Sequence, residues 1–139
     1  MTEPNRYGIT RKAAASFEET LEKARAALQA RGFGILWEID VRETMKKKLD
    51  VDFPPYRILG ACKPDIAHQA LTAEPDIGLL LPCNCIVRQD GDEVVVGAIA
   101  PRSLLGLTGR DDLTPFADKI AGFLEGVVAE AAGAGGAAS

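Results

Sequence analysis

The sequence has little of what metal centres and membrane spans require. It contains one histidine, His68, among 139 residues. A single imidazole excludes a metal site built from several histidines of one chain. Apolar stretches such as residues 77–81 are far shorter than the roughly 20 residues of a transmembrane helix. The sequence therefore predicts a protein that does not insert into a membrane.

Cysteine is also scarce, with three residues in the chain. The first six residues have no apolar segment of the kind found in secretory signals. An odd number of cysteines without an export signal argues against a disulfide framework, and reduced thiols are typical of the cytosol. We therefore expect a cytoplasmic protein with free thiols.

Basic residues are outnumbered, with 16 lysines and arginines against 20 acidic residues and a net charge of −4. Nucleic-acid binders need a surplus of basic residues to displace counterions from phosphates. Nucleic acid is therefore not an expected partner. The one basic cluster, Lys46 to Lys48, is typical of a solvated helix face.

The composition that remains is that of a globular domain, with 47% hydrophobic and 26% charged residues. A chain of this length buries enough surface to fold without metal or disulfide staples. We predict one domain over residues 7–130, preceded by a flexible N-terminus at residues 1–6. Residues 131–139 are nearly all alanine and glycine, and we predict that they form a disordered tail.

Helix signals are clear in several segments. Ser16 can cap a helix, with Glu19 completing a capping box. Apolar residues then recur at helical spacing from Phe17 to Leu28, and Gly32 is placed to end the helix in a left-handed conformation. Further helices are predicted over residues 43–49, from Pro64 to Pro75, and from Thr114 onward.

Alternating apolar and polar residues over 34–41 predict a strand that points Trp37 toward the core. Asp90 and Gly91 separate two apolar runs and predict a hairpin. The order of elements, β-α-β-(α)-β-α-β-β-α, predicts an α+β fold. We expect one mostly antiparallel sheet of about five strands, with helices packed mainly on one face. The predicted strands are 7–13, 34–41, 56–62, 77–88 and 93–100.

Three segments carry a family resemblance. The first combines Gly32-Phe33, the run 38–41, Thr44-Met45 and Lys48-Leu49; the second combines the run 59–64 with Ala67 and Ala70-Leu71; the third is the run 78–83, which ends in Cys83. In this order and spacing they resemble the domain of unknown function 302 family of small bacterial proteins, over roughly residues 8–128. The resemblance implies an α+β fold and a homodimer, and it implies no established activity. The family often has asparagine where this chain has Lys63, and lysine cannot cap the following helix.

Cys62 is the position where chemistry is most plausible. It ends a predicted strand directly before a helix N-terminus, where exposed N–H groups favour an anion. The charge of Lys63 acts in the same direction, and both influences lower a thiol pKa. Cys62 is therefore a possible nucleophile or redox thiol. The alternative is that it is a small buried hydrophobic residue, as free cysteines often are.

Cys83 and Cys85 are two residues apart and share one face of a regular strand. Thiolates bind soft metals such as zinc or copper(I), and Cys62 could supply a third ligand. Structural zinc sites, however, have two paired motifs, and this chain has one. By the resemblance Cys83 belongs to the family motif and Cys85 does not, so we prefer the pair Cys62 and Cys83.

Two further sites have a functional and a structural interpretation. His68 lies on the side or outer face of its helix, where it is a solvated residue, a dimer-interface residue or an axial ligand to haem iron. No motif for covalent haem attachment is present, and the sequence identifies no cofactor. Glu38 and Asp40 are paired carboxylates on one strand face, which are more often structural than catalytic.

These observations leave three hypotheses. The first is a homodimeric domain that binds a small ligand, a soft metal or a sulfur species near Cys62, Lys63, His68 and Cys83. The second is a thiol oxidoreductase or sulfur-transfer protein that uses Cys62 as the nucleophile and Cys83 as the resolving thiol. The third is a purely structural interaction module with an apolar surface that a second copy covers.

Overall fold

The computed structural model describes residues 6–133. Five strands form one antiparallel sheet in the order β1-β5-β4-β3-β2, so the predicted α+β fold is confirmed. The strands are β1 (Gly8–Ala13), β2 (Gly34–Asp40), β3 (Tyr56–Cys62), β4 (Cys83–Asp90) and β5 (Glu93–Ile99). The helices are α1 (Phe17–Ala30), α2 (Val41–Leu49), α3 (Pro64–Ala73), α4 (Pro101–Gly106) and α5 (Thr114–Ala132), with 3₁₀ helices η1 (Pro75–Leu80) and η2 (Asp111–Leu113).

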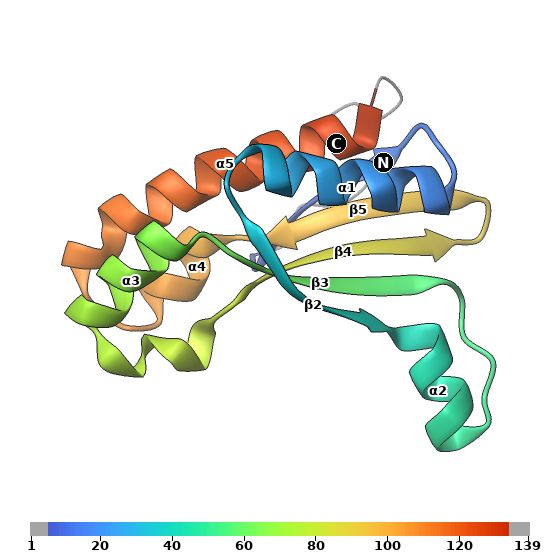
Figure 1. Cartoon of the computed structure of the whole chain (residues 1–139), viewed down its shortest axis with the longest axis horizontal. Helices are drawn as coiled ribbons and strands as arrows, with labels where there is room; N and C mark the ends of the chain where they lie inside the picture. Colours follow the sequence, from blue (N-terminus) through green and yellow to red (C-terminus); the bar gives the residue numbers. More distant parts are fainter. Residues whose placement is uncertain (1–5, 134–139) are drawn as a thin grey trace.

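Helices α1 and α5 lie side by side on one face of the sheet (Figure 1). The apolar stripe predicted for each helix faces the strands, which is how an amphipathic helix buries its apolar side. The main core lies between these two layers. Its fully buried members include Leu21 and Leu28 of α1, Leu124, Val127 and Val128 of α5, and Leu59, Val87 and Val96 of the sheet.

The ends of α1 follow the sequence signals. The Ser16 hydroxyl accepts a hydrogen bond of 3.2 Å from the Glu19 N–H. At the other end Gly32 adopts φ 85°, and the Phe33 N–H donates to the Leu28 carbonyl at 3.0 Å. This is the Schellman arrangement, in which a left-handed glycine lets the chain fold back over the last helical turn. The buried Phe33 then leads directly into β2.

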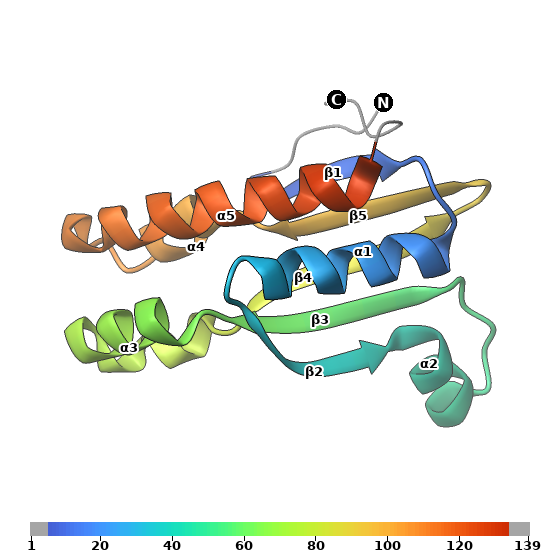
Figure 2. The same ribbon diagram turned by 45° about the horizontal axis from the view of Figure 1, so that its top comes forward.

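Beyond one end of the sheet, α3, η1, α4 and the first turn of α5 gather around a second, smaller apolar cluster of Ala70, Ile77 and Leu113 (Figure 2). The strand predicted to start at Ile77 is wrong in this part, because residues 75–80 form η1 and β4 begins at Cys83. Pro75 begins η1, and burial of Ile77 in this cluster holds the turn in place. This end of the domain contains the cavity described below.

Helix α2 lies on the side of the sheet opposite to α1 and α5 (Figure 1). Its ends are well formed: the Asp40 carboxylate accepts a hydrogen bond of 2.9 Å from the Glu43 N–H, and Asp50 ends the helix with φ 54°. No residue of α2 is buried. Within residues 6–133, the open face of the sheet therefore has no helix layer packed along it, only this projecting arm.

The prediction that Trp37 faces the core is wrong. An irregularity in the pairing between Ile35 and Trp37 shifts the register of β2 by one residue. A bulge of this kind turns the following side chains to the other face. Ile35 therefore packs against the core, while Trp37 lies on the open face with 37% of its surface exposed.

Helix α5 extends two residues past the predicted domain end at residue 130. It continues to Ala132 because Ala131 and Ala132 are fully buried in the core. The predicted flexibility of residues 1–5 and the predicted disorder of residues 134–139 concern positions outside the described part of the chain. Among the helices of residues 6–133, none has the length and apolar content needed to cross a bilayer.

Candidate functional site

Cys62 and Cys83 lie on neighbouring strands but face opposite sides of the sheet. Cys83 is paired in register with Ala61, which is fully buried on the core side. Successive side chains of a strand alternate between faces, so Cys62 points away from that side. The two thiols are free and not in contact. A disulfide between them would need a rearrangement of this strand end, because its geometry requires Cβ atoms that approach each other.

Cys83 has an environment that suppresses ionisation. Burial raises the pKa of its thiol to about 11, and the nearby Cys62 adds a smaller effect in the same direction. With this pKa about one thiol in ten thousand is ionised at neutral pH, and the thiolate is the reactive form. The surroundings of Cys83 therefore favour an inert thiol over a resolving thiol.

Cys85 shares the core-facing side of β4 with Cys83, as the spacing predicts, but it is nearly fully buried. Burial raises the pKa of Cys85 to about 12, with a further contribution from Cys83. Cys62, Cys83 and Cys85 are not brought together around one point. In the described part of the chain, no three or more histidine, cysteine, aspartate or glutamate side chains are grouped as metal ligands.

Lys63 occupies the N-cap position of α3 and makes no side-chain capping bond, as its side chain predicts. Its ammonium group lies 5.1 Å from the centre of the Phe123 ring and 3.5 Å from the Asp65 carboxylate. A cation over an aromatic face is attracted by the ring quadrupole. The charge of Lys63 is therefore engaged with these two partners, while its aliphatic stem forms part of a cavity wall.

His68 lies exposed on α3, and its backbone carbonyl accepts a hydrogen bond of 2.7 Å from the Thr72 hydroxyl. Its position agrees with the outer-face location that helical spacing predicts. His68 is not among the residues that line the cavity at this end of the domain. Its roles as an interface residue or an iron ligand stay predictions.

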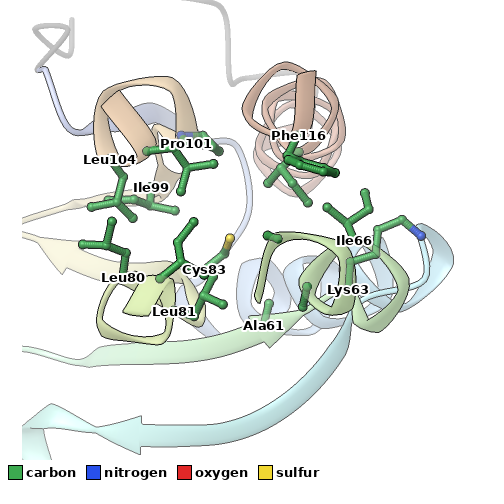
Figure 3. A pocket seen from close by; sticks show the side chains of 15 residues that line it. Ala61, Lys63, Ile66, Leu80, Leu81, Cys83, Ile99, Pro101, Leu104 and Phe116 are labelled. Carbon is green, nitrogen blue, oxygen red and sulfur yellow. The ribbon is translucent and has the colours of Figure 1, made fainter. Parts of the chain in front are cut away.

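A cavity of about 50 Å³ lies where the end of the sheet meets α3, η1, α4 and α5 (Figure 3). Of its 15 lining residues, only Cys83 and Lys63 carry a side-chain heteroatom. The thiol of Cys83 points into the space, whereas the amine of Lys63 points away from it (Figure 3). The cavity is therefore a hydrocarbon space with one thiol in its wall.

Glu38 and Asp40 are engaged in ion pairs and are not a free catalytic pair. Glu38 accepts hydrogen bonds from Arg25 of α1 and from Arg57 of β3, and Asp40 lies 3.2 Å from the same Arg57. The hydrogen bond from Arg25, followed by that from Arg57, holds the pKa of Glu38 below its usual value. The structural interpretation of these carboxylates is the better one, because both are neutralised by arginines.

The open face of the sheet carries a second hollow. It has a volume of about 420 Å³ and lies above β1, β5, β4 and β3, with Tyr56, Ile58 and Ile86 in its lining. Beside it, the indole of Trp37 covers Gly60 on the neighbouring strand. The same face has exposed apolar side chains at Ile39 and along α2 and the segment after it.

Sequence reasoning identified Cys83 and Lys63 as site residues, and both line the cavity. It did not identify the other walls, because they come from five separate segments of the chain. It also did not identify the open-face surface, although Leu49, Val51 and Phe53 alternate with acidic residues directly after the lysine run. That cluster of apolar residues beside Lys46 to Lys48 is the signal that could have found it.

Comparison with known proteins places the chain in a family. No curated protein matches it. The family model "Domain of unknown function DUF302" matches residues 9–131. Among solved structures, the chain is similar to an uncharacterized conserved DUF302 protein from Bacillus stearothermophilus, with 30% sequence identity and a TM-score of 0.82 over 87% of this chain and 94% of that chain. This match of sequence and fold over nearly the whole described chain confirms the resemblance: the chain belongs to the DUF302 family.

Proposed function

We propose that this domain is a self-associating interaction module, in which a second copy covers the open face of the sheet together with α2. The observation that carries the proposal is that α2 forms a regular helix in which no residue is buried. A helix of nine residues is too short to be stable in water by its own propensity. It therefore gains stability when a partner packs against it.

The surface around α2 is apolar enough to drive association. Trp37 and Ile39 of β2 are exposed on the open face, and Leu49, Val51 and Phe53 extend this apolar character along the arm. Contiguous exposed apolar patches on soluble domains mark interaction surfaces, because each exposed residue loses the free energy of burial. This surface lies on the side that α1 and α5 leave uncovered.

A second copy fits this surface better than an unrelated partner, because the same face has a projection and a hollow. The arm formed by α2 and residues 50–55 projects beside the open-face hollow of about 420 Å³. A two-fold interface is built from one patch used twice, so a projection and a hollow on one face complement each other.

Charge adds to this complementarity. Lys46, Lys47 and Lys48 lie on the arm, and the β4–β5 turn at the same end of the sheet carries Asp90, Asp92 and Glu93. Within the chain, Lys46 and Lys47 pair with Asp50 and Glu43, and Asp90 and Glu93 pair with Arg88 and Lys12. The charge attraction between two copies would therefore come mainly from Lys48 and Asp92. A two-fold axis running along the strands places the arm of one copy near the acidic turn of the other. A specific interface of this kind buries about 800 Å² of each partner.

The test is sedimentation velocity of the wild type and two matched variants over a range of concentrations. Leu49→Glu introduces a charge on the arm, where the leucine is 65% exposed, and Leu79→Glu makes the same change in η1, where it is 88% exposed. Neither leucine is part of the core, so both variants should fold. Leu49→Glu is expected to weaken self-association at least tenfold, as loss of a central apolar contact does, and Leu79→Glu is expected to leave it unchanged.

Trp37 gives an independent readout, because it is the one tryptophan of the sequence and lies on the proposed interface. Burial of its indole by a second copy should shift the emission to shorter wavelength as the protein concentration rises. A wild type that stays monomeric at high concentration contradicts the proposal. So does a dimer in which Trp37 emission does not change or Leu49→Glu has no effect.

A thiol oxidoreductase has less physical support. Cys62 and Cys83 point to opposite faces, and burial raises the pKa of Cys83 to about 11. Both features oppose rapid thiol–disulfide exchange, which needs an accessible thiolate and a partner within bonding geometry. A soft-metal site at the three cysteines also lacks support, because Cys62 faces the opposite side of the sheet from Cys83 and Cys85.

A further inference from the structure

The cavity beside Cys83 has the character of a ligand site, independently of any self-association. A water molecule inside a protein needs two to four polar partners, and this cavity offers one thiol. Burial keeps that thiol in its uncharged form. An apolar group is therefore the occupant that its walls favour.

The size of the cavity limits what enters it. Its volume of about 50 Å³ is roughly a third of the 150 Å³ that accommodates benzene in an engineered apolar cavity. An aromatic ring is too large for this volume. The end of a linear aliphatic chain, two or three carbons long, is the group that matches this volume.

The adjoining surface indicates where the rest of such a molecule would lie. A shallow groove of about 310 Å³ shares Ile77 and Leu80 with the cavity, and the strongly exposed Leu79 and Leu107 form part of it. These leucines offer apolar contact to a chain that leaves the cavity. The groove is a separate surface from the open sheet face, since α3, η1 and α4 lie at the end of the sheet opposite to α2 (Figure 1).

The charge of the groove selects the head group. Glu74 and Asp76 both line it. Arg110, which lies 2.8 Å from the Glu74 carboxylate, is also held by Asp112 at 2.6 Å. A carboxylate head group would meet like charges there, whereas an amine or a hydroxyl would not. Glu74 and Asp76, the acidic rim of the groove, therefore disfavour the binding of fatty acids relative to neutral or cationic amphiphiles.

We propose that this end of the domain binds small linear amphiphiles, with the aliphatic terminus in the cavity beside Cys83 and a neutral or cationic head group at Glu74 and Asp76. The two parts of the site act on different parts of the ligand. The cavity sets the affinity through chain length, and the rim sets the selectivity through charge.

The experiment compares hexylamine, hexanol and hexanoate as probes of the full chain by NMR, using the methyl signals of Ile77 and Leu80 to locate binding. Hexylamine and hexanol are expected to shift these signals, with hexanoate at least tenfold weaker. Shortening the probe by one methylene should weaken binding about fourfold. Xenon under pressure should shift the same methyl signals, because it fills the cavity without needing a head group.

Matched alanine substitutions on α3 test the cavity itself. Ala70→Leu places three extra carbons in the cavity wall and is expected to lower probe affinity at least tenfold. Ala73→Leu makes the same change at an exposed position of the same helix and should have no effect. Ala67→Leu changes a second, less buried wall residue and replaces Ala70→Leu if that variant is overpacked and unfolds.

Three outcomes would overturn the proposal: probe-induced shifts confined to the open sheet face, hexanoate binding as tightly as hexylamine, or probe affinity that Ala70→Leu and Ala67→Leu leave unchanged. If neither leucine variant folds, the wild-type chain alone tests the proposal: probe-induced shifts at the Ile77 and Leu80 methyl signals support it, and shifts confined to the open sheet face overturn it. None of these outcomes affects the dimer proposal, because Leu49 and Trp37 do not line the cavity or the groove.

Discussion

Gly60 of β3 lies directly beneath the indole of Trp37 on the neighbouring strand β2, and the substitution Gly60→Ala tests this contact. A Cβ atom at Gly60 would lie 2.4 to 2.6 Å from three carbons of the indole ring. Carbon atoms attract each other at about 3.5 to 4.0 Å and repel strongly at this shorter distance. The indole must therefore lift off the sheet when the methyl group is added.

The expected loss of stability follows from two opposing effects. Forcing an extra carbon into a close contact costs about 1–3 kcal/mol. Replacing glycine by alanine in a strand returns about 0.5–1 kcal/mol, because glycine loses more backbone freedom on folding. We therefore expect Gly60→Ala to lower the free energy of unfolding by about 1–2 kcal/mol, the difference between these effects.

The matched control is Gly34→Ala in β2. A Cβ atom there would meet only the Cys62 carbonyl oxygen, at 3.9 Å, which is an ordinary contact. Urea unfolding followed by circular dichroism, at one low protein concentration, measures both variants. Gly34→Ala should be neutral or slightly stabilising. In Gly60→Ala the Trp37 emission should also shift to longer wavelength, because the lifted indole is more exposed to water.

A double-mutant cycle with Trp37→Ala isolates the contact. In the Trp37→Ala background the indole is absent, so Gly60→Ala should no longer destabilise the protein. The reasoning is refuted if Gly60→Ala is as mild as Gly34→Ala and leaves the emission unchanged. It is equally refuted if the loss of stability persists in full when Trp37 has been removed.

Two further predictions concern ionisation. At about pH 8 a brief treatment with iodoacetamide should label Cys62 before Cys83 and Cys85, because burial raises the pKa of the latter two to about 11 and about 12; peptide mass mapping checks this, and earlier labelling of Cys83 would contradict it. Glu38→Gln should lower stability by about 1 kcal/mol at neutral pH through the lost pairing with the arginines. Because the pKa of Glu38 is lowered in the folded state, its contribution is complete above its usual value of 4.5 and disappears as the pH falls through the folded pKa. The stability difference between wild type and Glu38→Gln, measured by urea unfolding, should therefore shrink in acid, and a difference that grows in acid would contradict this account.

The elements with strong local signals were predictable from the sequence. Ser16 and Gly32 act at the ends of α1 as their residue types require, and Gly91 takes a positive φ in the β4–β5 turn. The errors arose where distant residues decide the conformation. The bulge after Ile35 reverses the face of Trp37, and no local property of this segment distinguishes a bulged strand from a regular one.

The candidate site was predictable only in part, for a related reason. The spacing of Cys83 and Cys85 correctly placed both thiols on one strand face. The relation between Cys62 and Cys83 depends on pairing between strands, which sets Cys83 opposite Ala61 and not opposite Cys62. The absence of buried residues in α2 also cannot be read from its sequence, because Met45 and Leu49 give the same apolar stripe whether or not something covers it.

The two proposed surfaces lie at opposite ends of the sheet, and this separation makes a last prediction (Figure 1). Changes at sites with no shared contacts act independently, so each binding event should be unaffected by the other substitution. Leu49→Glu should bind hexylamine as the wild type does, and Ala70→Leu should self-associate as the wild type does. The measurements are the NMR titration and sedimentation velocity described for each surface. If Leu49→Glu weakened hexylamine binding, the affinity of the cavity would depend on the partner copy. The sheet between the two surfaces would then have to exist in two arrangements, and both hexylamine and the second copy would have to bind one of them more tightly.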